Sequence, residues 1–69
     1  MKKAFFICTI CKDGKYFSWV ESISQDTNIA AFCRHNNIET LEFAESSKQA
    51  ERRAEQHNKD FQQNGTYMF

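Results

Sequence analysis

The stretch CTICKDGK, residues 8–15, decides how the first third of this 69-residue chain folds. It joins two runs of apolar, aromatic and β-branched residues, 3–11 and 16–23. Asp-Gly between two such runs predicts a β-hairpin, because a two-residue type I′ turn needs positive φ at both central positions. With Asp13 and Gly14 as the turn, the register places Cys11 opposite Tyr16 and continues step by step to Phe6 opposite Glu21.

Alternation along the two strands sorts their side chains into two faces. One face, here named the Phe6 face, is apolar except for a single glutamate, and we expect it to form the core. The other, the Ile7 face, is unusually apolar for a solvated surface and needs a cover. The Phe6 face holds Ala4, Phe6, Cys8, Ile10, Phe17, Trp19, Glu21 and Ile23, and the Ile7 face holds Phe5, Ile7, Thr9, Cys11, Tyr16, Ser18, Val20 and Ser22.

A polar break at 24–28 precedes a short helix that Asp26 or Thr27 is expected to cap by accepting a backbone N–H bond. Ile29, Ala30, Phe32 and Cys33 then recur at helical spacing, and Asn36-Asn37 ends the helix. Ile38 to Ala44 follows as a third strand, with Leu41 and Phe43 on one face.

A second helix is predicted from about Ser47 to Asn64. Ser46 and Gln49 have capping-box spacing at its start, and Gly65 suits the position after its last turn. Glu55 and Lys59 form a favourable i,i+4 pair worth roughly 0.3 kcal/mol. The stripe expected to face the sheet is Ala50, Ala54, His57 and Phe61.

These elements give one α+β domain over residues 1–69, with the order ββαβα. Because one helix separates strands 2 and 3, they run in the same direction. The predicted sheet is therefore antiparallel in the order 2-1-3, with both helices packed on one face.

Composition excludes several classes of function. Nine Lys and Arg balance nine Asp and Glu, so no global positive field attracts phosphate backbones. The apolar run at 4–10 is too short for a signal peptide, and no transmembrane segment is predicted. An odd number of cysteines, three, indicates reduced thiols and a cytoplasmic protein. With only Gly14 and Gly65, no phosphate-binding loop is present, and we expect neither a cofactor nor enzymatic activity.

A zinc site is one alternative interpretation of CTICKDGK. Cys8, Cys11, Cys33 and His35 have the composition of a closed tetrahedral site. The spacing is unfavourable, because residues three apart in a strand point to opposite faces. Cys33 and His35, two apart on a helix, diverge by roughly 200°. We therefore expect the cysteines to act as small apolar residues.

Nucleic-acid binding is a second alternative. Tyr16 beside Lys12 and Lys15 has the character of a surface on which single-stranded bases stack, and Arg52 and Arg53 could contact phosphates. Each basic residue has acidic neighbours, so a solvated charged surface is the simpler interpretation.

Contact with another protein is the favoured hypothesis. Apolar residues of the Ile7 face are not used by the expected core, and monomers rarely leave a large apolar patch uncovered. Either the tail 66–69 folds over this face as a lid, or the face docks on a second copy, as a homodimer, or on a different protein. The expected contact residues are Phe5, Ile7, Tyr16, Val20, Tyr67 and Phe69.

The second helix also carries a resemblance. Residues 48–58 read K-x-A-E-x-x-A-E-x-x-N, and 64–67 read N-G-T-Y. This is similar to small uncharacterised proteins of low-GC Gram-positive gut bacteria, their phages and mobile elements. The match covers about the last third of the chain, and His57 stands where the pattern has a large aromatic residue. The resemblance implies a mobile-element setting, in which small neutral proteins act by binding and modulating a larger protein.

Overall fold

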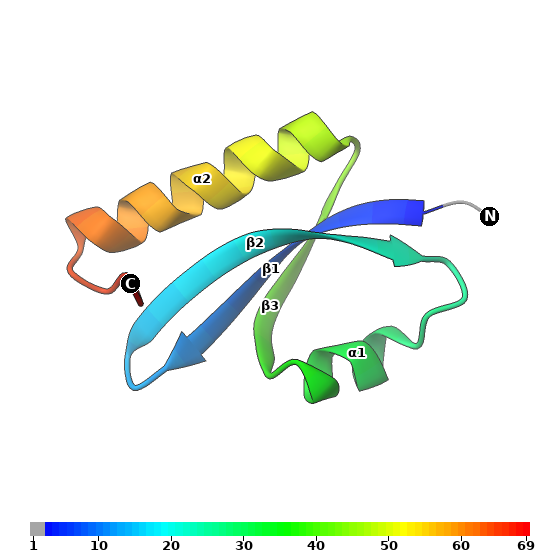
Figure 1. Cartoon of the computed structure of the whole chain (residues 1–69), viewed down its shortest axis with the longest axis horizontal. Coiled ribbons are helices and arrows are strands. Elements are labelled where there is room, and N and C mark those ends of the chain that lie inside the picture. The colour runs from blue at the N-terminus through cyan, green and yellow to red at the C-terminus, as the bar shows by residue number, and fades with distance from the viewer. Residues whose placement is uncertain (1–2) are drawn as a thin grey trace.

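Five elements follow one another in the computed structural model of the chain, which describes residues 3–69 (Figure 1). They form one antiparallel sheet in the order β2-β1-β3, so the predicted order ββαβα and the predicted sheet are confirmed. The elements are β1 (Lys3–Lys12), β2 (Lys15–Ser24), α1 (Ile29–His35), β3 (Ile38–Ala44) and α2 (Ser47–Gln63).

The hairpin has the register that Asp13-Gly14 predicts. Cys11 lies opposite Tyr16, Ile7 opposite Val20 and Phe6 opposite Glu21. Asp13 and Gly14 have φ values of 54° and 77°, as a type I′ turn requires. The pairing of these two ten-residue strands therefore agrees with the register that the local turn signal predicts.

The helix ends follow from side-chain caps. Asn28, rather than the predicted Asp26 or Thr27, caps α1 by accepting the Ala31 N–H at 3.1 Å. Ser46 caps α2, as predicted, by accepting the Gln49 N–H at 3.2 Å. The Gln49 side chain accepts in turn from the Glu45 N–H. The helix ends at Gln63 with Asn64 as its C-cap, one residue before the predicted end.

α2 covers the Ile7 face, so the prediction that the Phe6 face forms the core against it is wrong. Ile7 and Ala44 of the sheet pack against Ala50 and Ala54 of α2 in the main buried cluster. The Ile7 face also carries Thr9 and Ser18, which are buried and whose hydroxyls hydrogen-bond at 2.7 Å. Ala50 and Ala54 on the helix, and Thr9 and Ser18 at the middle of the Ile7 face, are small, and they let α2 lie close to the sheet.

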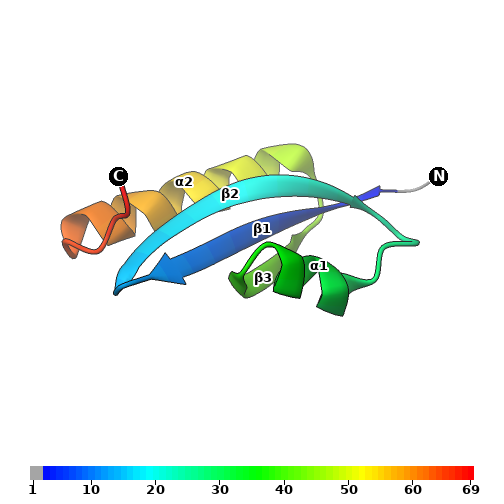
Figure 2. The ribbon, with the colours of Figure 1, turned by 60° about the horizontal axis from the view of Figure 1, so that its bottom comes forward.

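α1 lies on the other side of the sheet, and the expectation that both helices cover one face is also wrong (Figures 1 and 2). Within residues 3–69, α1 contacts β3 and makes no contact with α2. Its Cys33 lies near Cys8 of the Phe6 face. Both Cys8 and Ile23 of this face are buried. The sheet is therefore a middle layer, with the long helix on one side and the short helix on the other.

The predicted stripe of α2 does face the sheet. Ala50 and Ala54 are buried, Phe61 stacks on Tyr16 with ring centroids 5.1 Å apart, and His57 Nε2 lies 3.1 Å from Glu42 Oε1. Asn58 adds a contact that the stripe did not include. Its Oδ1 accepts from the Ser18 N–H at 2.8 Å and its Nδ2 donates to the Ser18 carbonyl at 2.9 Å.

Candidate functional site

The contact residues predicted on the Ile7 face lie beneath α2. Ile7 is fully buried, and Phe5 and Val20 pack against the same cluster. Tyr16 lies under Phe61. Because these four side chains form the interface between sheet and helix, the prediction that they form an open contact surface is wrong. The open part of the sheet belongs to the Phe6 face instead.

The C-terminal tail, residues 65–69, pairs with the edge of β2. Tyr16 N–H donates to the Thr66 carbonyl at 2.7 Å, and Met68 N–H donates to the Tyr16 carbonyl at 2.9 Å. These bonds form a parallel bridge between Tyr16 and Tyr67. The tail therefore lies along the edge strand, and its side chains reach the Phe6 face rather than the Ile7 face.

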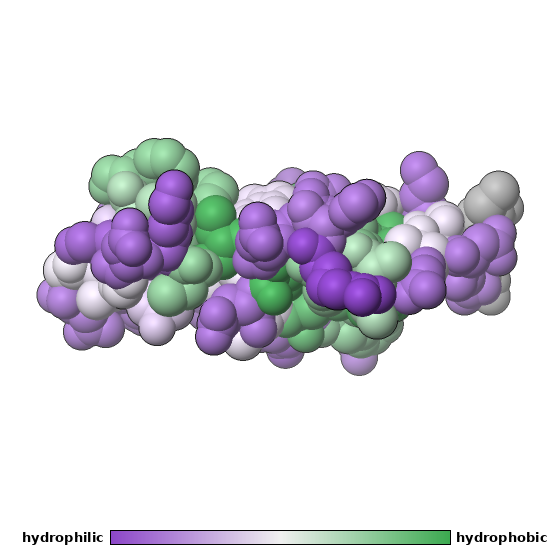
Figure 3. All heavy atoms as spheres, turned by 90° about the horizontal axis from the view of Figure 1, so that it is seen from below, coloured by the Kyte–Doolittle hydropathy of each residue, from purple (hydrophilic) through white to green (hydrophobic). Residues whose placement is uncertain are grey.

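Four aromatic rings meet where the tail crosses the Phe6 face, and we name them the C-terminal aromatic cluster: Phe17, Trp19, Tyr67 and Phe69. Phe17 is its centre, with ring centroids 5.0 Å from Phe69, 6.2 Å from Tyr67 and 6.0 Å from Trp19. Phe69 is 80% exposed although it touches two other rings. Seen from the α1 side, hydrophobic side chains lie at the end of the molecule that carries the hairpin turn and the C-terminus and continue along its middle, with hydrophilic side chains between them (Figure 3).

Only half of this cluster is in the predicted contact set. The sequence named Tyr67 and Phe69 but assigned Phe17 and Trp19 to the core. The size of the side chains is the signal that separates the two faces: the residues opposite each other at the middle of the Ile7 face are Thr9 and Ser18, while the Phe6 face carries Phe17 and Trp19.

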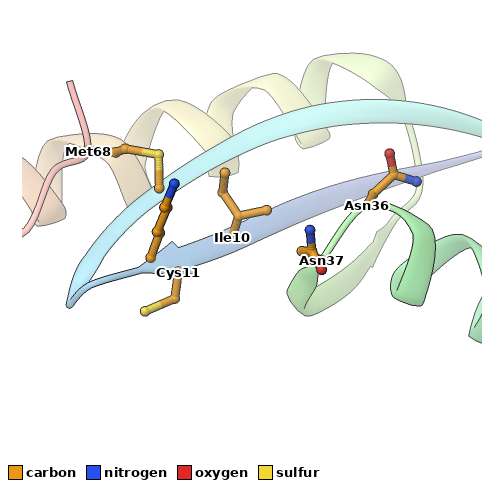
Figure 4. Close-up of a pocket in the computed structure, with 6 residues that line it drawn as sticks. Ile10, Cys11, Asn36, Asn37 and Met68 are labelled. Atoms are coloured by element: carbon orange, nitrogen blue, oxygen red, sulfur yellow. The ribbon is translucent and has the colours of Figure 1, made fainter.

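A cavity adjoins the cluster on the same face. It has a volume of about 460 Å³ and is lined by Ile10, Cys11, Lys12, Asn36, Asn37 and Met68. Ile10 of β1 pairs with Phe17 of β2, so the cavity and the cluster lie on adjacent strands. Figure 4 shows Met68 of the tail at one side of the cavity and Asn36 and Asn37, which follow α1, at the other. The lining is apolar at Ile10 and Met68 and carries one cation, Lys12.

Charge is scarce around the cluster. Glu21, the one acidic residue of the Phe6 face in the hairpin, accepts a hydrogen bond from Trp19 Nε1 at 2.9 Å. Lys15 is turned to the tail, where its Nζ donates to the Gly65 carbonyl at 2.8 Å. The exposed aromatic surface is therefore suited to another uncharged, apolar surface.

The cysteines are not brought together as metal ligands. Cys8 and Cys11 lie on opposite faces of β1, and within residues 3–69 no group of three or more His, Cys, Asp or Glu side chains is placed to hold a metal ion. Burial raises the pKa of the Cys8 thiol to about 12, with smaller contributions from Glu21 and Cys33. Cys8 is therefore a protonated, buried thiol at neutral pH.

The residues of the nucleic-acid alternative are also dispersed. A side-chain hydrogen bond with Cys11, and the charge of the Cys11 thiolate, raise the pKa of Tyr16. The Tyr16 ring stacks on Phe61. Lys12 and Lys15 flank the hairpin turn, close to the C-terminal end of α2, while Arg53 lies near its start and approaches the Phe43 carbonyl at 3.5 Å. Arg52 is exposed beside it. The two lysines and the two arginines thus form no continuous basic surface.

No helix among residues 3–69 is long and apolar enough to cross a membrane. Comparison with protein-family models, with curated proteins and with solved structures found no match.

Proposed function

We propose that this chain is a small non-enzymatic module that works by protein–protein contact, and that its contact surface is the C-terminal aromatic cluster. The exposure of Phe69 carries the proposal: a phenylalanine that is 80% exposed, yet held in contact with Phe17 and Tyr67, presents a large apolar area in a fixed position. Aromatic side chains are the commonest anchors of protein interfaces, because they bury much area at little cost in conformational entropy.

The backbone bonds of the tail support this role. A lid would place its apolar side chains against the sheet and bury them. Here the two bonds to Tyr16 hold the tail at the edge of β2, and Phe69 remains outside. The surface that fits this cluster is uncharged and apolar. The resemblance of α2 to proteins of phages and mobile elements adds a setting in which such a module would bind and modulate a larger protein.

Site-specific cross-linking in the producing cell tests the proposal. A photoreactive phenylalanine analogue at position 69 should give discrete cross-linked products. The same analogue at Arg52, on the outer surface of α2, serves as the matched control and should give few. Replacing Phe17 by Ala in the cross-linking chain should remove the products, because Phe17 holds Phe69 in place. Equal, diffuse cross-linking at both positions would contradict a defined contact surface.

A further inference from the structure

We infer that the partner of the C-terminal aromatic cluster is a second copy of this chain, with the Phe69 ring of each copy seated in the cavity beside Ile10 of the other. The inference rests on the proposed function and specifies its partner. One observation carries it: the exposed ring of Phe69 and the cavity beside Ile10 lie next to each other on one face.

The placement of ring and cavity satisfies the condition for a two-fold interface. In such an interface, if residue i contacts residue j of the partner, then j also contacts the partner's i. A protruding ring and a cavity must therefore occur side by side on the same surface. Phe69 packs on Phe17, and Ile10, directly opposite Phe17 in the register, lines the cavity.

The dimensions and chemistry of the cavity fit an aromatic ring. Its volume of about 460 Å³ lies in the range of small-molecule pockets, ample for one phenyl group. Ile10 provides an apolar wall, and Met68 provides a flexible thioether, a group that makes favourable contacts with ring edges. Lys12 at the rim adds a cation that can lie over the face of the incoming ring.

Electrostatics also favours a second copy. The net charge of the chain is zero, so two copies do not repel each other at long range. Within each copy, Glu21 accepts a hydrogen bond from Trp19 and Lys15 donates one to the Gly65 carbonyl, so both side chains are held against their own chain. A standard interface buries about 800 Å² per partner, roughly a sixth of the 4992 Å² surface, with about 20–30 residues on each side, whereas the cluster and the cavity together involve far fewer. We therefore expect a weak dimer with a micromolar dissociation constant.

The test is sedimentation equilibrium combined with native mass spectrometry over a series of concentrations. Phe69→Ser removes the ring, and Lys12→Trp fills the cavity at its exposed rim. Each variant should raise the dissociation constant of the homodimer at least about tenfold. Arg52→Ser, on the outer surface of α2, is the matched control and should leave it unchanged. Circular dichroism should show that all three variants retain the fold.

A mixture of the two variants makes the test specific. Phe69→Ser retains the cavity and Lys12→Trp retains the ring, so the mixture should form heterodimers at concentrations where neither variant forms homodimers. A Phe69→Ser homodimer as tight as the wild type, or the absence of heterodimers in the mixture, would overturn the ring-in-cavity arrangement. A wild-type chain that stays monomeric at every concentration would overturn self-association. Cross-links from position 69 to a different protein would then leave the proposed function standing.

Discussion

At the scale of single residues, Asn58 takes the place of a missing strand. An edge strand exposes N–H and C=O groups, and the carboxamide of Asn58 satisfies both groups of Ser18 with bonds of 2.8 and 2.9 Å. A carboxamide has the donor and acceptor of a peptide group, so one side chain reproduces one step of a β-ladder. This contact holds α2 to the outer edge of β2, in addition to the packing of α2 on the face of the sheet.

Replacing Asn58 by Ala should lower the free energy of unfolding by about 1–3 kcal/mol, because a partly buried N–H and C=O lose their partners. Gln63→Ala on the same helix is the control, since Gln63 is exposed, and should change it by less than about 0.5 kcal/mol. Urea denaturation measures both. Equal effects would mean that water replaces the carboxamide without loss.

Cys8 makes the fold sensitive to alkaline pH. Its pKa is raised from 9.0 to about 12 in the folded chain, so between these values the unfolded chain releases the thiol proton while the folded chain retains it. The contribution to stability is complete below pH 9.0 and is lost as the pH rises toward 12, by up to about 1.4 kcal/mol per pH unit.

Urea denaturation at neutral pH and at about one unit above the ordinary thiol pKa measures this dependence. The wild type should lose about 1 kcal/mol more than Cys8→Ala between the two conditions. If Cys8→Ala and the wild type lost the same amount, the buried thiol would not be the cause.

At the scale of elements, alanines determine how close α2 lies to the sheet. Ala50 is fully buried and Ala54 nearly so, and both contact the cluster around Ile7 and Ala44. Neither position has room for a longer side chain without moving the helix, because packed interiors leave few voids.

Ala50→Leu should therefore destabilise the fold by about 1–3 kcal/mol through overpacking. Glu51→Leu places the same side chain one residue further on, where the helix is exposed, and should have a much smaller effect. Thermal unfolding of the two variants gives the comparison. A stable Ala50→Leu variant would show that the helix can shift on the sheet at little cost.

Element boundaries and strand register could be predicted because their signals are local. Asp13-Gly14 determines the hairpin, Ser46 and Gln49 the start of α2, and Gly65 its end. The face covered by α2 could not be predicted from alternation, because both faces of the hairpin are apolar. The choice depends on fit between distant segments: Ala50 and Ala54 pack on Ile7 and Ala44, and Asn58 reaches Ser18, forty positions away in sequence.

The candidate site divides in the same way. Composition and the Gly65 hinge indicate a surplus of apolar residues and mark Tyr67 and Phe69 as candidate contact residues. The part played by Phe17 and Trp19 in the C-terminal aromatic cluster, and the cavity, could not be predicted from the sequence. Each of these features joins the hairpin to a segment at least twenty residues away.

At the scale of the whole molecule, both edges of the sheet are protected while part of the Phe6 face, beyond α1, is left open. Asn58 and the tail occupy the outer edge of β2. β3, the other edge strand, carries Glu39 and Glu42 and has a bulge where it pairs with Thr9 and Ile10 of β1. Charges and bulges on an edge strand oppose pairing with another chain. These protected edges are consistent with our proposal that association occurs at the aromatic end of the Phe6 face.

Removing a negative charge from β3 should make it easier for this edge strand to pair with another chain. Glu39→Val gives an edge strand with one acidic residue fewer and higher β-propensity, and we expect it to aggregate several-fold faster than the wild type at elevated temperature. Glu55→Val, an exposed change on α2, controls for added hydrophobicity. Light scattering and thioflavin fluorescence follow the rate. Equal rates for the two variants would show that the edge is protected by something other than this charge.

The path of the tail has a practical consequence for handling the protein. Phe69 lies at one end of the long axis and Lys3 toward the other, in a molecule with extents of 39 × 25 × 14 Å (Figure 1). An affinity tag fused directly after Phe69 would crowd the aromatic rings and the neighbouring cavity. A tag at the other end of the chain, ahead of β1, would be far from them. Binding measurements made with the two fusions should therefore disagree, and the amino-terminal fusion is the one to use.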